Sequence, residues 1–184
     1  TDPRTNNVTN AVAVPFFLPK TPNISSTDVG QSLDELYIDA VGRSFTETLH
    51  DYEFTTHPKD GLVGNLTVVP SSRHQRLLDA MARDVVVGYF FVSLSEYSVP
   101  MAVEQMNTLP DQFLLAGGVD TCAALIGSPD LLLKTDGYPP LLWLSALQEE
   151  DENAGFHFEA YGYNLTFNRR LHFGQLGEFW DGGL

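Results

Sequence analysis

The sequence predicts one α+β domain, with a mostly antiparallel sheet packed by several short helices and an extended N-terminal arm before it. Apolar residues recur at helical spacing over residues 33–51. Residues 85–94 form an uncharged run rich in β-branched and aromatic side chains, and apolar and polar residues alternate from residue 156 onward. At 184 residues the chain has the usual length of one domain and can bury a substantial core.

The N-terminal arm is expected to span residues 1–32, ahead of a globular α+β domain at 33–184. The arm is rich in Thr, Asn, Ser and Pro, except for the apolar segment AVAVPFFLP at 11–19, whose two prolines exclude a helix and a central strand. Such a segment must be buried, either along its own domain or at a groove or sheet edge of a neighbouring chain. The candidate self-association residues are Val12, Val14, Phe16, Phe17 and Leu18.

The remaining elements follow from periodicity and from helix and turn signals. Ser32 and Glu35 have the spacing of a capping box that begins the first helix. A strand at 62–69 carries Asn65, and residues 85–94 are predicted to form a buried central strand. Further helices are predicted at 73–83, 100–107, 111–116, 119–126 and 139–147, and a β-hairpin closes the chain.

Composition excludes several function classes. The chain has 24 acidic and 10 basic residues, and its net charge of −14 repels nucleic acid unless a local basic patch forms. The best candidates for such a patch are Arg73, Arg76 and Arg83, for which a solvated helix face is the favoured interpretation. No uncharged apolar run is long enough for a membrane span. Cys122 is the single cysteine, so no internal disulfide forms, and its small, apolar neighbours predict core packing.

Four N-glycosylation sequons, where roughly one is expected by chance, predict a secreted, extracellular glycoprotein. The modified residues would be Asn7, Asn23, Asn65 and Asn164. The lack of disulfides argues mildly against this compartment.

Residues 155–173 contain the most suggestive group of side chains. His157 and Glu159 project to one face of a strand, and His172 could lie across from them if the chain turns between. Two imidazoles and a carboxylate can hold Fe(II) or Zn²⁺. A patterned strand with surface histidines is the favoured alternative, and no cofactor is expected. The acidic run at 149–152 could bind Ca²⁺, but a solvated loop is favoured because the spacing of a dedicated calcium loop is missing.

Three functions remain open from the sequence. The first is a secreted, N-glycosylated structural or interaction protein that self-associates through its N-terminal arm, with another copy or another extracellular protein as partner. The second is an extracellular enzyme with an acidic or metal-assisted site at His157, Glu159 and His172. The third is a carbohydrate- or small-ligand-binding domain, in which Trp143 and Trp180 could stack against a sugar, although a core role for both is favoured.

Overall fold

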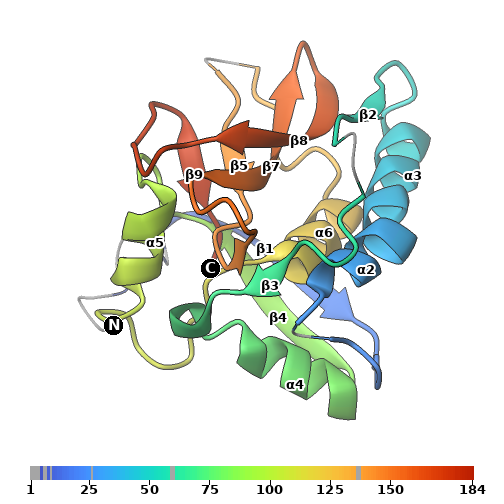
Figure 1. Ribbon diagram of the computed structural model, residues 1–184. Coiled ribbons are helices and arrows are strands. Elements are labelled where there is room, and N and C mark those ends of the chain that lie inside the picture. Colours follow the sequence, from blue (N-terminus) through green and yellow to red (C-terminus); the bar gives the residue numbers. More distant parts are fainter. Residues whose placement is uncertain (1–4, 6–7, 9, 26, 59–60, 136–137) are drawn as a thin grey trace.

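A five-stranded mixed sheet and one central helix organise the chain. The computed structural model describes residues 5, 8, 10–25, 27–58, 61–135 and 138–184. The sheet has the order β2-β8-β7-β5-β9. Its strands are β2 (Phe54–Thr56), β8 (Asn164–Leu171), β7 (Ala154–Tyr161), β5 (Leu141–Trp143) and β9 (Trp180–Gly182). The sheet lies in the upper half of Figure 1, with α3, α4 and α5 around the outside of the molecule.

Two smaller antiparallel sheets complete the strand content. β1 (Val12–Leu18) pairs with β4 (Val86–Val92), and β3 (Thr67–Val68) pairs with β6 (Leu147–Gln148). Among the strand pairs of the described residues, β2–β8 and β5–β9 are parallel and the others antiparallel. The predicted single α+β domain is therefore confirmed, with a principal sheet that is mixed.

Helix α6 (Gly118–Gly127) lies in the middle of the fold (Figure 1). Its residues 118–125 are all buried, and apart from Asp120 and Thr121 their side chains are apolar or absent, as expected for a helix inside a core. Cys122 lies in this buried stretch with no exposed surface, so its predicted core packing is confirmed. One core surrounds α6 and includes Phe45, Phe90 and Phe158.

The first predicted helix exists but begins earlier than expected. It runs as α2 (Val29–Ser32), a π-helical turn (Leu33–Tyr37) and α3 (Ile38–Thr48). The Asp28 carboxylate caps it by accepting a hydrogen bond from the Gln31 backbone N–H at 3.2 Å, so the capping box predicted at Ser32 is wrong. Gly42 lies inside α3 because the Phe54 ring packs where its side chain would be.

Three other predicted elements are wrong. Residues 139–147 form β5, a turn and the start of β6 rather than a helix, because their apolar side chains are buried in sheets. Residues 111–116 form no helix. Of the strand predicted at 62–69, only Thr67–Val68 is extended, which leaves Asn65 in a turn.

The helices predicted at 73–83, 100–107 and 119–126 are confirmed. They are α4 (Gln75–Arg83), α5 (Val99–Gln105) and α6. The closing hairpin is β7–β8, with a two-residue turn at Gly162 and Tyr163. Both turn residues have positive φ, at 55° and 69°, as a type I′ turn requires. No helix in the described part of the chain combines the length and apolar character needed to cross a membrane.

The apolar N-terminal segment is a strand of the domain itself. β1 pairs with β4 over its whole length, from Val12 opposite Val92 to Leu18 opposite Val86. Leu18 is fully buried in the core around α6, and Val14 and Phe16 pack partly against it. The prolines have the predicted consequence, because Pro15 lies in a sheet of two strands and not in a central strand.

Candidate functional site

The outer face of the β1–β4 sheet is apolar and open. Side chains alternate between the two sides of the sheet, so one side enters the core and the other faces outward. Exposure is 59% at Phe17, 73% at Val87 and 66% at Tyr89. Residues 85–94 therefore contain the predicted strand, but the prediction that this strand is buried is wrong. The outward side, which we call the β1–β4 face, consists of Ala13, Pro15, Phe17, Val87, Tyr89 and Phe91.

A pocket of about 380 Å³ opens beside this face, and we call it the Asp120 pocket. Its volume lies in the range typical of small-molecule sites. Apolar side chains dominate its lining, and Asp120 is the acidic one. The lining residues are Phe16, Leu77, Val86, Val87, Gly88, Tyr89, Phe91, Gln112, Phe113, Leu114, Asp120 and Leu184.

Asp120 is placed by the first turn of α6. Its Oδ1 accepts hydrogen bonds from the backbone N–H groups of Gly117 and Thr121, both at 3.0 Å. These bonds cap the helix and offset the cost of burying a carboxylate that retains only 5% exposure. The other oxygen, Oδ2, lies 3.7 Å from Nδ1 of His74. That separation is longer than a hydrogen bond.

His74 lies behind Asp120 and has no exposed surface. Its ring packs against Gly117, where an added Cβ would lie 2.6 Å from Nε2, so only glycine leaves room for it. Neither ring nitrogen has a hydrogen-bond partner among the described residues. Buried polar atoms are nearly always hydrogen-bonded, so an unpartnered imidazole next to a pocket calls for a functional explanation.

Arg73 holds the backbone that carries His74. It adopts the left-handed conformation with φ of 63°, which is uncommon outside glycine. Its guanidinium donates to the backbone carbonyls of Met106, Leu109, Pro110 and Phe113, which fixes the loop beside the pocket. Arg73 thus serves the fold internally.

The metal trio predicted from the sequence does not form. His157 Nε2 lies 3.7 Å from Glu159 Oε2, so β7 does bring these two side chains together. Among the described residues, no group of three or more His, Cys, Asp or Glu side chains could hold a metal ion. The favoured alternative was wrong as well, because His157 and His172 are not surface residues but are almost fully buried.

Both histidines pack on an indole instead. The Trp143 ring centroid lies 5.0 Å from His157, 5.5 Å from His172 and 5.0 Å from Trp180. We call these four residues the Trp143 cluster. Gly155 makes room for it, since an added Cβ would lie 3.2 Å from the Trp143 ring. The predicted core role is confirmed for Trp143, which is 2% exposed, whereas Trp180 is only partly buried.

One imidazole of this cluster, His172, and one carboxyl group next to it, Glu159, have shifted pKa values. The neighbouring His157 imidazole lowers the pKa of Glu159, whose side chain is 32% exposed. Burial lowers the pKa of His172. Its Nδ1 accepts a hydrogen bond from the Gly174 backbone N–H at 3.0 Å, so protonating that nitrogen would break the bond.

The predicted glycosylation residues have different surroundings. Asn23 and Asn65 are exposed, and Asn65 lies in a turn. Asn164 begins β8 and is half-buried, with its Oδ1 accepting from the Glu53 backbone N–H at 2.8 Å. A glycan is attached through the amide nitrogen, so that bond is compatible with modification. Asn7 lies outside the described residues.

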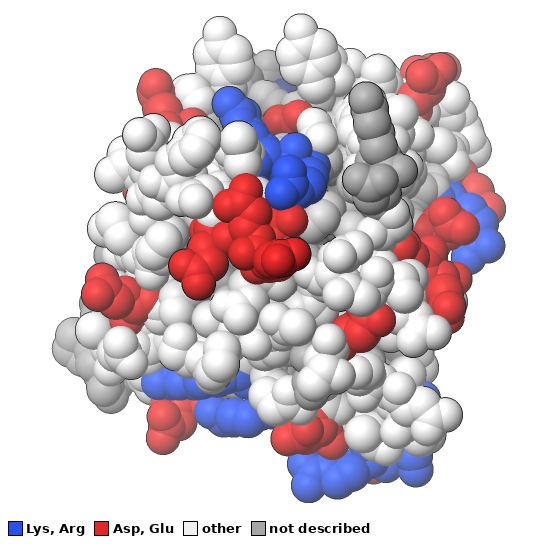
Figure 2. Space-filling model, viewed as in Figure 1, with Lys and Arg blue, Asp and Glu red and all other residues white. Residues whose placement is uncertain are grey.

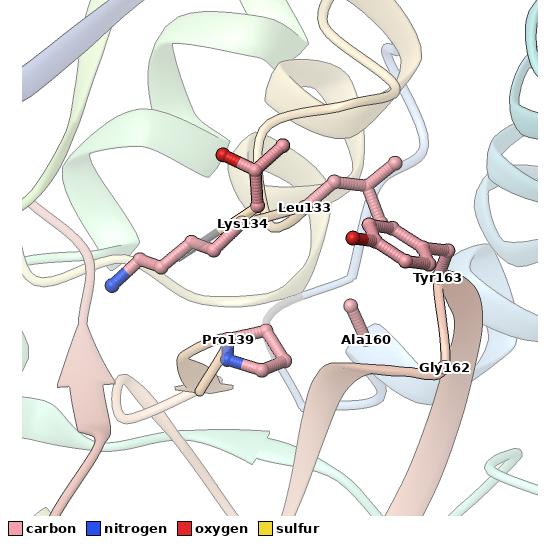
Figure 3. A pocket seen from close by; sticks show the side chains of 7 residues that line it. Leu133, Lys134, Pro139, Ala160, Gly162 and Tyr163 are labelled. Carbon is pink, nitrogen blue, oxygen red and sulfur yellow. The ribbon is translucent and has the colours of Figure 1, made fainter. Parts of the chain in front are cut away.

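Two further pockets lie elsewhere among the residues that the structure describes. A pocket of about 190 Å³ lies at the tip of the β7–β8 hairpin, where Lys134 extends away from Tyr163 (Figure 3). Another, of about 350 Å³, is lined by Glu149, Glu150, Asp151, Arg169 and Asn65. Acidic residues gather in the middle of the face seen in Figure 2. The Glu149 carboxylate accepts hydrogen bonds from the Arg169 guanidinium, with nitrogen–oxygen distances of 2.9–3.1 Å.

Sequence reasoning missed the Asp120 pocket entirely. Neither Asp120 nor His74 is among the candidate site residues named from the sequence. One signal was available, because Asp120 stands in the first turn of a predicted helix, where carboxylates cap the backbone. Comparison with models of known protein families, with curated proteins and with solved structures finds no match for this chain.

Proposed function

We propose that this chain is a secreted, N-glycosylated interaction protein that self-associates through the β1–β4 face. The observation that carries the proposal is the outward exposure of Phe17, Val87 and Tyr89 side by side on one small sheet. Phe17 and Val87 are paired directly in the register of that sheet. Contiguous exposed apolar surface is typical of sites where proteins meet.

The charge of the protein favours a second copy at this face over other approaches. Two copies with a net charge of −14 repel one another across most of their surface. The β1–β4 face contains no charged side chain, so the repulsion is least where two such faces meet. A face that binds its own copy through a two-fold axis needs only to match itself.

The residues proposed for self-association are fewer than the sequence suggested. Leu18 is committed to the core of its own chain, and Val14 and Phe16 are partly so. Val12 is exposed by 61% but lies on the other side of the sheet from the β1–β4 face, so Phe17 remains from β1, and Val87 and Tyr89 join it from β4. The secretory assignment rests on the sequons, with Asn23 and Asn65 accessible for modification.

Analytical ultracentrifugation of the glycoprotein, purified from a eukaryotic secretory host, tests the proposal. The protein should be dimeric or larger at about 0.1 mM, and Phe17→Asp should make it monomeric, because a dimer would bury two carboxylates in an apolar interface. Leu176→Asp is the matched control: Leu176 is 61% exposed, lies off the β1–β4 face, and its replacement should leave the oligomer intact.

A wild-type protein that is still monomeric at about 0.1 mM would overturn self-association. The secretory part is tested separately by mass spectrometry before and after enzymatic removal of N-glycans. A mass that does not change on treatment would contradict it.

A further inference from the structure

We propose that the Asp120 pocket binds a small molecule with an apolar body and a single ammonium head, seated on the Asp120 carboxylate. This inference goes beyond self-association, because it concerns a different ligand and rests on Asp120, which is not part of the β1–β4 face. Val87, Tyr89 and Phe91 belong to both the face and the pocket lining. The pocket reaches from β4 to the loop at 112–114 and the first turn of α6.

The apolar lining of the pocket favours a ligand whose larger part is hydrocarbon. The side chains of Phe16, Leu77, Val86, Phe113 and Leu114 offer hydrocarbon surface around a volume of about 380 Å³. An alkyl chain or an aromatic ring would be removed from water there, which is favourable in proportion to the area buried. Sites of this kind use a small number of polar groups to orient an otherwise apolar ligand.

The Asp120 carboxylate favours a positively charged hydrogen-bond donor as the head group of the ligand. Its Oδ1 is engaged by two backbone N–H groups, and Oδ2 accepts no hydrogen bond from the described part of the chain. A carboxylate is an acceptor only, so it binds a donor and repels an anion. An ammonium makes a charge-assisted hydrogen bond there, stronger than that of an alcohol.

His74 adds no exposed surface to the pocket and is not among its lining residues. Its Nδ1 lies 3.7 Å from Asp120 Oδ2, which is too far for a hydrogen bond, so the imidazole does not engage this oxygen. The acidic field of the protein further raises the local concentration of a cation.

The test uses three probes of equal chain length, namely octylammonium, octanol and octanoate, with affinities measured by isothermal titration calorimetry. We expect octylammonium to bind most tightly, octanol more weakly and octanoate not at all. Asp120→Asn should weaken octylammonium by about tenfold or more and leave octanol unchanged. The Asn side chain still presents an oxygen to the Gly117 and Thr121 N–H groups, so the cap on α6 is kept.

Asp111→Asn is the matched control, because it removes a carboxylate of the neighbouring loop that is 95% exposed and does not line the pocket. It should leave all three affinities unchanged. A second measurement does not depend on any variant. In ¹H–¹⁵N spectra of the wild-type protein, octylammonium should shift the amides of Phe113, Gly117 and Asp120 and leave that of Trp143 in place.

The proposal is overturned if no probe binds, if octanoate binds as well as octylammonium, or if Asp120→Asn binds octylammonium like the wild type. It stands apart from self-association, because Phe17 does not line the pocket. Phe17→Asp should therefore bind octylammonium normally even where it abolishes the dimer. A monomeric wild-type protein that binds octylammonium would refute self-association alone.

Discussion

The molecule contains two pairs of a buried histidine and a nearby carboxylate, with the same separation and different surroundings. His74 lies 3.7 Å from Asp120, and His157 lies 3.7 Å from Glu159. Both imidazoles are buried, and neither has a hydrogen-bond partner on its ring nitrogens within the described residues. Equal distances therefore do not distinguish a binding site from a structural contact.

The carboxylates and their neighbours make the distinction. Asp120 is buried, held by the first turn of α6 and open to an apolar pocket. Glu159 is partly exposed to solvent, and its histidine packs on the Trp143 ring. We therefore expect substitutions in the Trp143 cluster to change stability, and substitutions at the Asp120 pocket to change binding.

The largest effect is expected for Trp143→Ala. This side chain is almost fully buried and contacts His157, His172 and Trp180, so truncation removes apolar burial and leaves a cavity. The free energy of unfolding should fall by about 3–5 kcal/mol. Urea titration followed by circular dichroism measures it.

Phe113→Ala provides the contrast, since Phe113 is half-buried and lines the Asp120 pocket. It should cost clearly less stability than Trp143→Ala and weaken octylammonium, whereas Trp143→Ala should leave octylammonium affinity unchanged under folding conditions. Equal effects of the two variants on binding would remove the distinction between the regions.

The sequence predicted the parts of the fold that depend on local patterns. The β7–β8 hairpin and helices α4, α5 and α6 follow from periodicity and from glycine and proline positions. The segment 139–147 was wrong because its apolar run fits a helix and a strand equally well, and pairing with β7 and β9 decides the outcome. Such pairing involves residues far apart in the chain.

The same limit applies to the candidate site. His157 and Glu159 are two residues apart on one strand, so their proximity could be predicted. His74 and Asp120 are 46 positions apart in the sequence, and only the packing of α6 on the turn before α4 brings them together. The burial of His157 was also unpredictable, because Trp143 covers it from another strand.

A smaller effect of opposite sign is expected for His74→Leu. The histidine keeps two polar nitrogens buried without partners, which costs stability. An apolar side chain of similar size removes that cost, so the free energy of unfolding should rise by about 1 kcal/mol. A variant that is less stable than the wild type would show that the two imidazole nitrogens carry no such cost.

The smallest effect is a dependence of stability on pH that belongs to the Trp143 cluster and its neighbour Glu159. The pKa of His172 is lowered by burial, so the unfolded chain takes up a proton more readily than the folded one. Stability should therefore begin to fall as the pH drops below about 6.5, the ordinary pKa of histidine.

The pKa of Glu159 is also lowered, here by His157, and its contribution is complete above about pH 4.3. That contribution is lost as the pH falls further, through the lowered pKa of the folded state. Glu159→Gln should remove this second decline and keep the first. Urea titrations from about pH 7 to about pH 3 separate the two steps, since they fall in different pH ranges. If the variant shows the same decline below pH 4.3 as the wild type, the His157–Glu159 pair contributes nothing measurable, and the two histidine–carboxylate pairs differ in burial alone.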